Sequence, residues 1–221
     1  MKTNIISDKR FTDIALLDCS PLHEPALFDA AFSLVDMARK DKISACRSKE
    51  DRCLSLGVGL LCRRLLKRSD ISSEHLGFDA DGRPVLADVP AYLSLSHSGR
   101  YAMAGISSSP IGVDVEIHQP ESIPIAGHFF MPEEQELLSA SNDPTACFFD
   151  IWCRKECMIK RDGLQDLREL STLSPRGDAC FYDFPLDGYS CVCYGSRNIT
   201  PRFYSVPLED LVNLSGTGPP L

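Results

Sequence analysis

The chain has 221 residues, of which 43% are hydrophobic, so it holds enough apolar side chains to fill an ordinary globular core. No stretch reaches the roughly 18 apolar residues that a membrane helix needs, and the start lacks the apolar run of a signal peptide. With a net charge of −8, the chain is unsuited to general binding of a polyanion. We therefore expect a cytoplasmic protein with neither a membrane nor a nucleic-acid partner.

The elements expected in the first part of the chain begin with a helix over residues 24–40 and a longer helix over 48–68. Ser48 is suited to cap the longer helix at its N-terminus. An Asp-Gly turn within 75–89 predicts a hairpin. Residues 91–108 then read as strand, turn and strand, with the turn built from the Ser-His-Ser-Gly stretch at 96–99.

A second run of elements begins near residue 110 with a strand over 111–116, followed by helices over 131–140 and 143–163. Asp143 is placed to cap the last of these helices and Gly163 to end it. The later strand "GYSCVCYGS" echoes the earlier "RYAMAGISS". We therefore predict an α+β fold of two similar halves, residues 1–109 and 110–214, with a disordered tail over 215–221.

Charge and cysteine usage leave two questions open. Residues 39–68 carry ten Lys or Arg against three acids, a local excess of +7 on an acidic protein. This pattern fits either a local anionic ligand or acidic partner, or a helix with a solvated basic face. The ten cysteines contain no C-x-x-C pair, so we expect mostly reduced core thiols and no structural zinc.

Two carboxylates are the first candidates for chemistry. Asp114 and Glu116 lie two apart on a predicted strand, so their side chains share one face while Val113 and Val115 face the core. Oxygen ligands on a rigid strand suit a hard divalent cation such as Mg²⁺. The pair by itself also fits an ordinary solvated strand edge.

The helix at 143–163 adds a third carboxylate. Trp152, Glu156 and Lys160 follow one another at four-residue steps and share one face. Glu156 would complete a metal site if this face met the strand, and Lys160 would neutralise phosphate charge. An ordinary Glu156–Lys160 ion pair along the helix is the alternative.

His97 is the remaining candidate. A serine hydrolase is disfavoured because neighbouring residues on a strand face opposite ways and the chain has no G-x-S-x-G elbow. Hydroxyls, an imidazole and glycine-freed amides suit phosphate oxygens instead. A purely structural histidine remains the alternative.

Three ordered blocks tie these pieces together: "DGRPVL", "LSLSHSGRYAMAGISSSPIGVDVE" and "FFDIWCRKECMIKRDG". They resemble the G-K/R-P, S-H-S with G-[IV]-D-[IV]-E, and W-x-x-K-E-x-x-x-K motifs of the Sfp-type 4′-phosphopantetheinyl transferases. The helix before the blocks is similar too, so the resemblance covers residues 36–163. It implies two α+β halves related by a pseudo-twofold axis, with the site in the cleft between them.

The resemblance also implies a role for each matching residue. The metal ligands would be Asp114, Glu116 and Glu156, and the catalytic residues Glu156, Lys160 and His97. Glu156 or a water would take the proton of the attacking hydroxyl. The contacts to coenzyme A would come from Arg39, Lys42, Ser55, Arg83, Ser96, His97, Lys155 and Lys160.

The implied reaction is the Mg²⁺-dependent transfer of the 4′-phosphopantetheine arm of coenzyme A to a serine of an apo-acyl or apo-peptidyl carrier protein, by a monomer that releases 3′,5′-ADP. One segment departs from the family: "DGLQDLRELSTLSPRG" lacks the second glycine of a G-x-G-L stretch, near where carriers dock. The alternatives are a degenerate paralogue that only binds coenzyme A or a carrier, and a metal-dependent hydrolase of nucleotide pyrophosphates.

Overall fold

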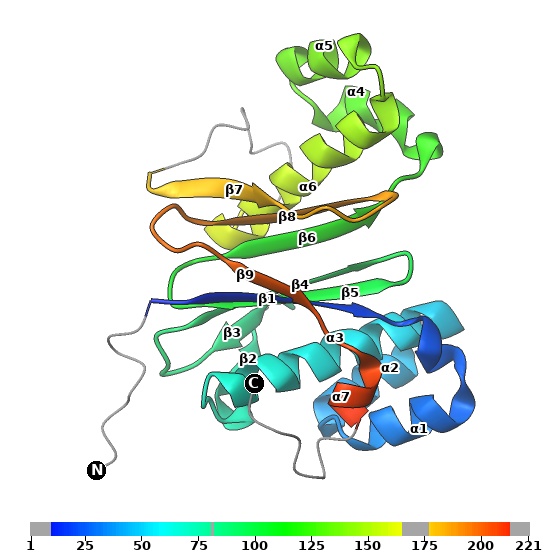
Figure 1. Cartoon of the computed structure of the whole chain (residues 1–221), viewed down its shortest axis with the longest axis vertical. Helices are drawn as coiled ribbons and strands as arrows, with labels where there is room; N and C mark the ends of the chain where they lie inside the picture. Colours follow the sequence, from blue (N-terminus) through cyan, green and yellow to red (C-terminus); the bar gives the residue numbers. More distant parts are fainter. Residues whose placement is uncertain (1–9, 81, 165–176, 213–221) are drawn as a thin grey trace.

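The computed structural model describes residues 10–80, 82–164 and 177–212, and its elements form a mixed α+β fold (Figure 1). Within these residues two sheets lie face to face, and helices cover the outer side of each sheet. The predicted α+β class is confirmed. The tail expected over 215–221 and most of the divergent segment after Gly163 lie outside the described residues.

The first sheet has the strand order β4-β5-β1-β9. Its strands are β1 (Thr12–Asp18), β4 (Tyr92–Ser98), β5 (Tyr101–Ser107) and β9 (Arg202–Ser205). β5 pairs antiparallel with both β1 and β4, whereas β9 runs parallel to β1. Residues 202–212 thus follow the second sheet in sequence but return in space to the first.

The second sheet has the order β6-β8-β7, and a separate hairpin precedes β4. Its strands are β6 (Gly112–Ile117), β7 (Ala179–Asp183) and β8 (Tyr189–Ser196), all antiparallel to their neighbours. The predicted hairpin is present as β2 (Leu76–Phe78) and β3 (Pro84–Leu86).

Two long helices pack against the outer faces of the sheets. α3 (Lys49–Arg68) begins at the predicted cap, where Ser48 accepts a hydrogen bond from the Asp51 amide. α6 (Pro144–Asp162) begins at the predicted Asp143 cap and ends at Gly163 with φ +72°. The remaining helices are η2 (Ser20–His23), α1 (Pro25–Ser33), α2 (Met37–Ala45), η3 (Ser73–His75), η4 (Pro120–Ile125), α4 (Ala126–Phe129), α5 (Pro132–Ala140) and α7 (Leu208–Val212).

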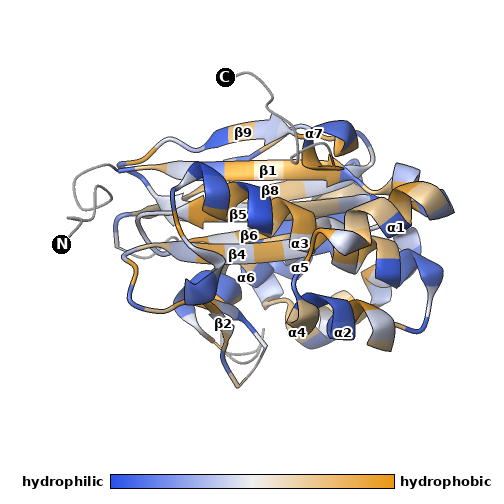
Figure 2. Cartoon of the chain, turned by 90° about the horizontal axis from the view of Figure 1, so that it is seen from below, coloured by the Kyte–Doolittle hydropathy of each residue, from blue (hydrophilic) through white to orange (hydrophobic). Residues whose placement is uncertain are grey.

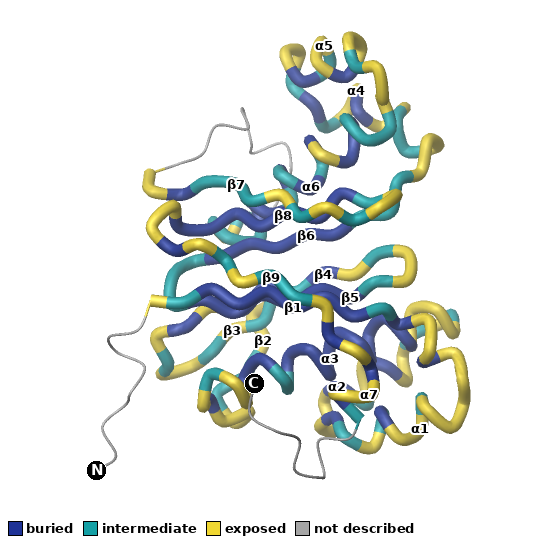
Figure 3. The backbone as a smooth tube through the Cα atoms, viewed as in Figure 1, coloured by how far each residue is buried: buried dark blue, intermediate teal, exposed yellow. Residues whose placement is uncertain are grey.

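Hydrophobic residues run along β1 and β5 and through part of α3 (Figure 2), and the buried ones form clusters where the layers meet. One core cluster joins α3 to the first sheet, another joins α6 to the second sheet, and a third lies between the two sheets. Most residues of the central strands and of α3 are accordingly buried, while most residues of α5 are exposed (Figure 3). Val113 and Val115 belong to the cluster between the sheets, as the strand alternation predicts.

Glycine allows α6 to approach the second sheet closely. A Cβ added at Gly112 would lie 1.9 Å from the Cys157 carbonyl oxygen, which no real side chain tolerates. Helix and strand backbones therefore meet directly at this point, and the polar side chains of α6 lie beside those of β6.

The single helix expected over 24–40 is wrong, because the chain forms α1 and α2 with a break at residues 34–36. Asp36 adopts an extended conformation, and its carboxylate accepts a hydrogen bond from the Arg39 amide at 2.8 Å. Asp36 is thus the N-cap of a second helix rather than an interior residue, since aspartate stabilises a helix at its N-cap and is unfavourable in the helix interior.

The turn expected at 96–99 is also wrong in its extent. Ser96, His97 and Ser98 belong to β4, and the turn consists of Gly99 and Arg100. Gly99 has φ +58°, which glycine adopts without the strain of a Cβ. The register continues to Ser98 opposite Tyr101, so the strand alternation, and not a loop, sets where these side chains point.

The ten cysteines all lie in the described part of the chain and are free thiols, seven of them buried. Among the described residues no group of three or more His, Cys, Asp and Glu is placed to hold a metal ion, zinc included. The described helices include none with the length and apolar character needed to cross a membrane.

Candidate functional site

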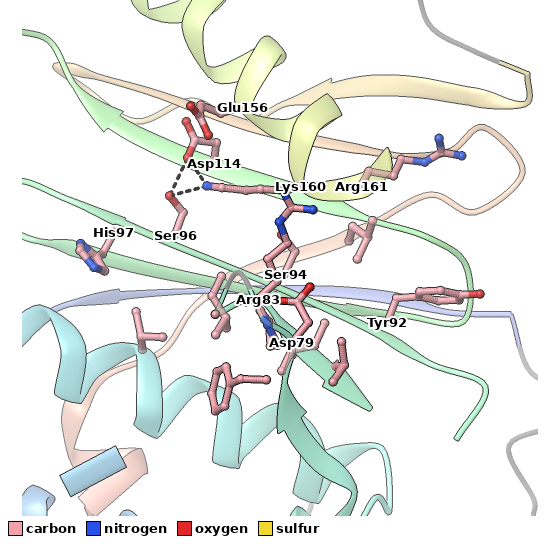
Figure 4. Close-up of a pocket in the computed structure, with 18 of the residues that line it drawn as sticks. Asp79, Arg83, Tyr92, Ser94, Ser96, His97, Asp114, Glu156, Lys160 and Arg161 are labelled. Atoms are coloured by element: carbon pink, nitrogen blue, oxygen red, sulfur yellow. Dashed lines mark hydrogen bonds and ion pairs between the residues drawn. The ribbon is translucent and has the colours of Figure 1, made fainter. Parts of the chain in front are cut away.

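A pocket of about 860 Å³ opens at the meeting of the two sheets and is lined by both of them, by the β2–β3 hairpin and by α2, α3 and α6 (Figure 4). Ten of the eleven residues that the sequence predicts for the site line it. They are Arg39, Lys42, Ser55, Arg83, Ser96, His97, Asp114, Glu116, Glu156 and Lys160.

Asp114 lies at the centre of the polar part of the pocket and is 1% exposed. Its Oδ1 accepts hydrogen bonds from Ser96 Oγ and Lys160 Nζ, each at 2.6 Å (Figure 4). Its Oδ2 is buried and accepts no hydrogen bond. A buried acceptor without a partner costs free energy, so Asp114 Oδ2 is suited to receive a cation.

Glu116 and Glu156 line the same pocket. Burial, and then the nearby Asp114 carboxylate, raises the pKa of Glu116 to about 7 against the opposing effect of the Ser98 hydrogen bond. Burial also raises the pKa of Glu156, with Lys160 opposing the rise. Three carboxylates thus crowd one partly desolvated region, which a divalent cation would stabilise.

Lys160 pairs with β6 and not with the neighbouring turn of its own helix. Its ammonium lies 2.6 Å from Asp114 Oδ1, 3.2 Å from the Val113 carbonyl oxygen and 3.3 Å from Ser96 Oγ. Burial alone would lower the pKa of Lys160, but the charge of Asp114 outweighs it and raises the pKa above its usual value. The simple Glu156–Lys160 helical pair is therefore not what the structure shows.

His97 and Ser96 face opposite ways from β4, as neighbours on a strand must. Ser96 points to Asp114, whereas His97 lies on the other side of the strand, still against the pocket (Figure 4). Burial, and next the Lys160 charge, lowers the pKa of His97 below its usual value of 6.5. His97 is therefore neutral at pH 7 and offers a hydrogen bond rather than a charge.

A second set of cations lines the far end of the pocket. The guanidinium of Arg39 and the ammonium of Lys42 each lie 5.7 Å from the Phe78 ring. Ser55 Oγ is buried there without a hydrogen-bond partner. Arg83, from the hairpin, donates a hydrogen bond to the Leu164 carbonyl beyond α6. In the basic stretch over residues 39–68, Arg39 and Lys42 thus line a pocket suited to an anion, while Lys67 and Arg68 at its end are exposed.

Lys155 is the predicted residue that the structure does not bring to the pocket. Its side chain is 0% exposed and pairs at 2.9 Å with Glu134 of α5. Glu134 also accepts a hydrogen bond from the Met131 amide at the start of α5. Neighbours on a helix point about 100° apart, so Glu156 faces the pocket and Lys155 faces the α4–α5 layer.

Ser98, to which the sequence motifs assign no role, donates a hydrogen bond to Glu116 Oε2 at 2.6 Å. The alternation of serine at 94, 96 and 98 opposite the alternation of carboxylates at 114 and 116 was the available signal. The aromatic wall of the pocket, Phe78 and Tyr92, also carries no signal in the sequence alone.

Comparison with known proteins gives consistent results. Residues 110–185 match the model of the 4′-phosphopantetheinyl transferase superfamily. The 4′-phosphopantetheinyl transferase Sfp of Bacillus subtilis (strain 168) is 33% identical over 137 residues, which are 59% of this chain and 61% of that protein. The 4′-phosphopantetheinyl transferase gsp of Aneurinibacillus migulanus is 32% identical over 112 residues, 49% of this chain and 47% of that protein.

The matched region thus spans about three fifths of the length of Sfp and about half of the length of gsp. Residues 110–185, which match the superfamily model, include β6 and α6 and with them the pocket residues Asp114, Glu116, Glu156 and Lys160. The resemblance that the sequence motifs predict is confirmed: about three fifths of the chain is similar to Sfp-type 4′-phosphopantetheinyl transferases.

Proposed function

We propose that this protein transfers the 4′-phosphopantetheine arm of coenzyme A to a serine hydroxyl of an apo-carrier protein, acyl or peptidyl, in a Mg²⁺-dependent reaction that releases 3′,5′-ADP. The observation that carries the proposal is that carboxylates from β6 and α6, Lys160, His97 and a separate cation cluster share one pocket. The similarity to proteins named as 4′-phosphopantetheinyl transferases supports coenzyme A as the substrate of this pocket.

The residues present fit a divalent cation. The available donors, on Asp114, Glu116 and Glu156, are carboxylate oxygens, which hard cations prefer. Asp114 Oδ2 is buried without a partner, and burial, with a smaller effect of the Asp114 charge, raises the pKa of the other two carboxylates. When bound, Mg²⁺ would offset the charge of the pyrophosphate. Among the described residues, these carboxylates line one pocket without forming a preassembled set of three metal ligands.

The cations of the pocket divide the charge of coenzyme A between them. Arg39 and Lys42 lie at the end of the pocket that Phe78 lines, and we assign the 3′-phosphate and nucleotide to this end. Lys160 lies near the carboxylates, where the pyrophosphate would be held, and the neutral His97 would add a hydrogen bond to a phosphate oxygen. Offsetting several phosphate charges in this way lets a neutral hydroxyl approach the phosphorus.

Glu156 is our candidate for the group that takes the proton of the attacking serine. Burial raises the pKa of Glu156, which is therefore closer to neutral pH than the pKa of an exposed glutamate. A base of this kind accepts a proton more readily during attack and releases it afterwards. The proton moves from the carrier's serine oxygen to a Glu156 carboxylate oxygen or to water.

We also propose that the two halves are related by a pseudo-twofold axis. Three strands of the first sheet follow the order β4-β5-β1, with β9 added beside β1, and those of the second sheet follow the order β7-β8-β6. In both halves the first strand pairs antiparallel with the last, and a long helix covers the sheet. The pocket would then lie across the axis, between the halves.

The intact mass of an apo-acyl and an apo-peptidyl carrier protein, incubated with the protein, coenzyme A and Mg²⁺, tests the proposed activity. We expect a gain of one phosphopantetheinyl arm that EDTA abolishes. No gain on either carrier, with coenzyme A still bound, would favour the binding-only alternative. The same proposal places a monomer in the cytoplasm, which light scattering and cell fractionation test.

A further inference from the structure

Serine side chains join the facing edges of the two sheets. Ser94, Ser96 and Ser98 occupy alternate positions of β4, and their hydroxyls accept hydrogen bonds from alternate amides of β6. An edge strand otherwise leaves these amides unpaired. The three bonds run from Val113 N to Ser94 Oγ at 2.9 Å, from Val115 N to Ser96 Oγ at 3.4 Å, and from Ile117 N to Ser98 Oγ at 3.1 Å.

Two of these serines also hold a carboxylate. Ser96 Oγ donates to Asp114 Oδ1, and Ser98 Oγ donates to Glu116 Oε2, both at 2.6 Å. In each case the carboxylate lies 18 residues beyond its serine. The residue 18 beyond Ser94 is Gly112, which has no side chain to bond. A carboxylate partner therefore distinguishes Ser96 and Ser98 from Ser94, and Ser96 has Lys160 as an additional partner.

The hydroxyl of Ser96 is fully used within the protein. A serine hydroxyl donates one hydrogen bond and accepts two. Ser96 donates to Asp114 and accepts from the Val115 amide and from Lys160 Nζ. It has no remaining capacity for the phosphate oxygen that the family resemblance assigns to it. Its effect is to hold Asp114 Oδ1 and to leave Oδ2 without a partner.

We propose that Ser96 and Ser98 are positioning residues for the cation-binding carboxylates of β6. Each serine fixes one oxygen of its carboxylate and so orients the other for a divalent cation. The proposal rests on the cation site of the proposed function and assigns residues that act on it through Asp114 and Glu116. Hydrogen-bond partners of metal ligands commonly change metal affinity by about 10- to 100-fold when they are removed.

The test is a titration of the full-length, coenzyme-free protein with Mn²⁺, followed by electron paramagnetic resonance of the free ion. S96A and S98A are compared with S94A, which loses the same hydroxyl and the same kind of amide bond but no carboxylate contact. We expect S96A and S98A to raise the Kd for Mn²⁺ by about tenfold or more. S94A should change it less than about twofold, and S98T should retain the wild-type value.

The two proposals fail in different ways. If the wild-type protein binds Mn²⁺ and D114A abolishes binding, but S96A and S98A match S94A, the positioning role is overturned while the cation site stands. If the wild-type protein binds no Mn²⁺, the cation site itself is overturned, and the positioning role with it. Urea denaturation of each variant shows that a loss of affinity is not a loss of folding, and S98A and S98T serve if S96A does not fold.

Discussion

At the scale of single residues, the three carboxylates of the site differ in whether a cation is paired with them. Asp114 is paired with Lys160 and Ser96, while Glu116 and Glu156 have pKa values raised by burial. A substitution at Asp114 leaves the Lys160 ammonium without its anion, whereas a substitution at Lys160 leaves the buried Asp114 carboxylate without its cation, so the two changes have different costs. This distinction decides which substitutions test chemistry and which test folding.

Replacing Glu156 with glutamine should abolish transfer while preserving the fold. The amide keeps the size and hydrogen-bonding capacity of the side chain but cannot take a proton or carry a charge. We expect the rate of arm transfer, measured by intact mass over time, to fall by about a hundredfold or more. A far-UV circular dichroism spectrum equal to that of the wild type serves as the control, and a variant with near-normal activity would remove Glu156 from its role.

At the scale of elements, α6 connects the pocket to the α4–α5 layer through side chains on its two sides. Glu156 faces the pocket, and the adjacent Lys155 is buried against Glu134 of α5. A buried ion pair is costly to break but need not stabilise the fold more than an apolar pair would. We read Lys155 as a structural residue of the helix that carries the site.

K155M should lower the free energy of unfolding by about 3 kcal/mol or more, because it leaves the Glu134 carboxylate buried without its cation. E134Q/K155M should recover most of this loss, since glutamine is neutral and still accepts the hydrogen bond from the Met131 amide. Urea denaturation of the single and double variants measures both effects. Equal losses in K155M and E134Q/K155M would contradict this interpretation.

D36A should destabilise α2 by about 1 kcal/mol through loss of the N-cap. Since α2 carries Arg39 and Lys42 into the pocket, we also expect weaker binding of coenzyme A. Calorimetric titration of coenzyme A and urea denaturation measure the two effects. D29A, at an exposed position of α1, is the matched control. An unchanged Kd for coenzyme A in D36A would show that the N-cap does not position Arg39 and Lys42 for binding.

At the scale of the whole molecule, the pocket exists because two sheets and two long helices meet around it. The serines of β4 join one sheet edge to the other, and the hairpin is joined to the end of α6 through Arg83. The close contact of α6 with β6 at Gly112 sets the spacing of Glu156 and Asp114. The positions of the site residues thus depend on how the two sheets, the hairpin and α6 pack against one another.

G112A should disturb this packing, because its Cβ would overlap the Cys157 carbonyl oxygen. We expect a loss of about 2 kcal/mol or more in the free energy of unfolding, together with weaker Mn²⁺ binding as α6 shifts from β6. Denaturation and the Mn²⁺ titration report on the two consequences. G127A, whose added Cβ would meet nothing within 4 Å, is the control; equal behaviour of the two variants would show that the close contact does not set the site.

The sequence by itself determined most of the elements and the identity of the candidate site. Caps at Ser48 and Asp143 and the terminal Gly163 are local signals, so they placed the two long helices closely. Strand alternation predicted that Asp114 and Glu116 share a face opposite Val113 and Val115. The spacing along α6 put Glu156 and Lys160 on the pocket side. These features depend only on near neighbours in the chain.

Only the tertiary structure decided which groups these side chains contact. The cap at Asp36 overrode a helical pattern, and the register of β4 with β5 replaced a predicted turn. Lys155 pairs with α5, and the hydroxyls of Ser96 and Ser98 are taken up by β6, because contacts between distant segments depend on how the layers pack. The alternation of the serines does not say which strand they face, and an ion pair between two helices leaves no periodic pattern in the sequence, yet the pocket is formed by such contacts.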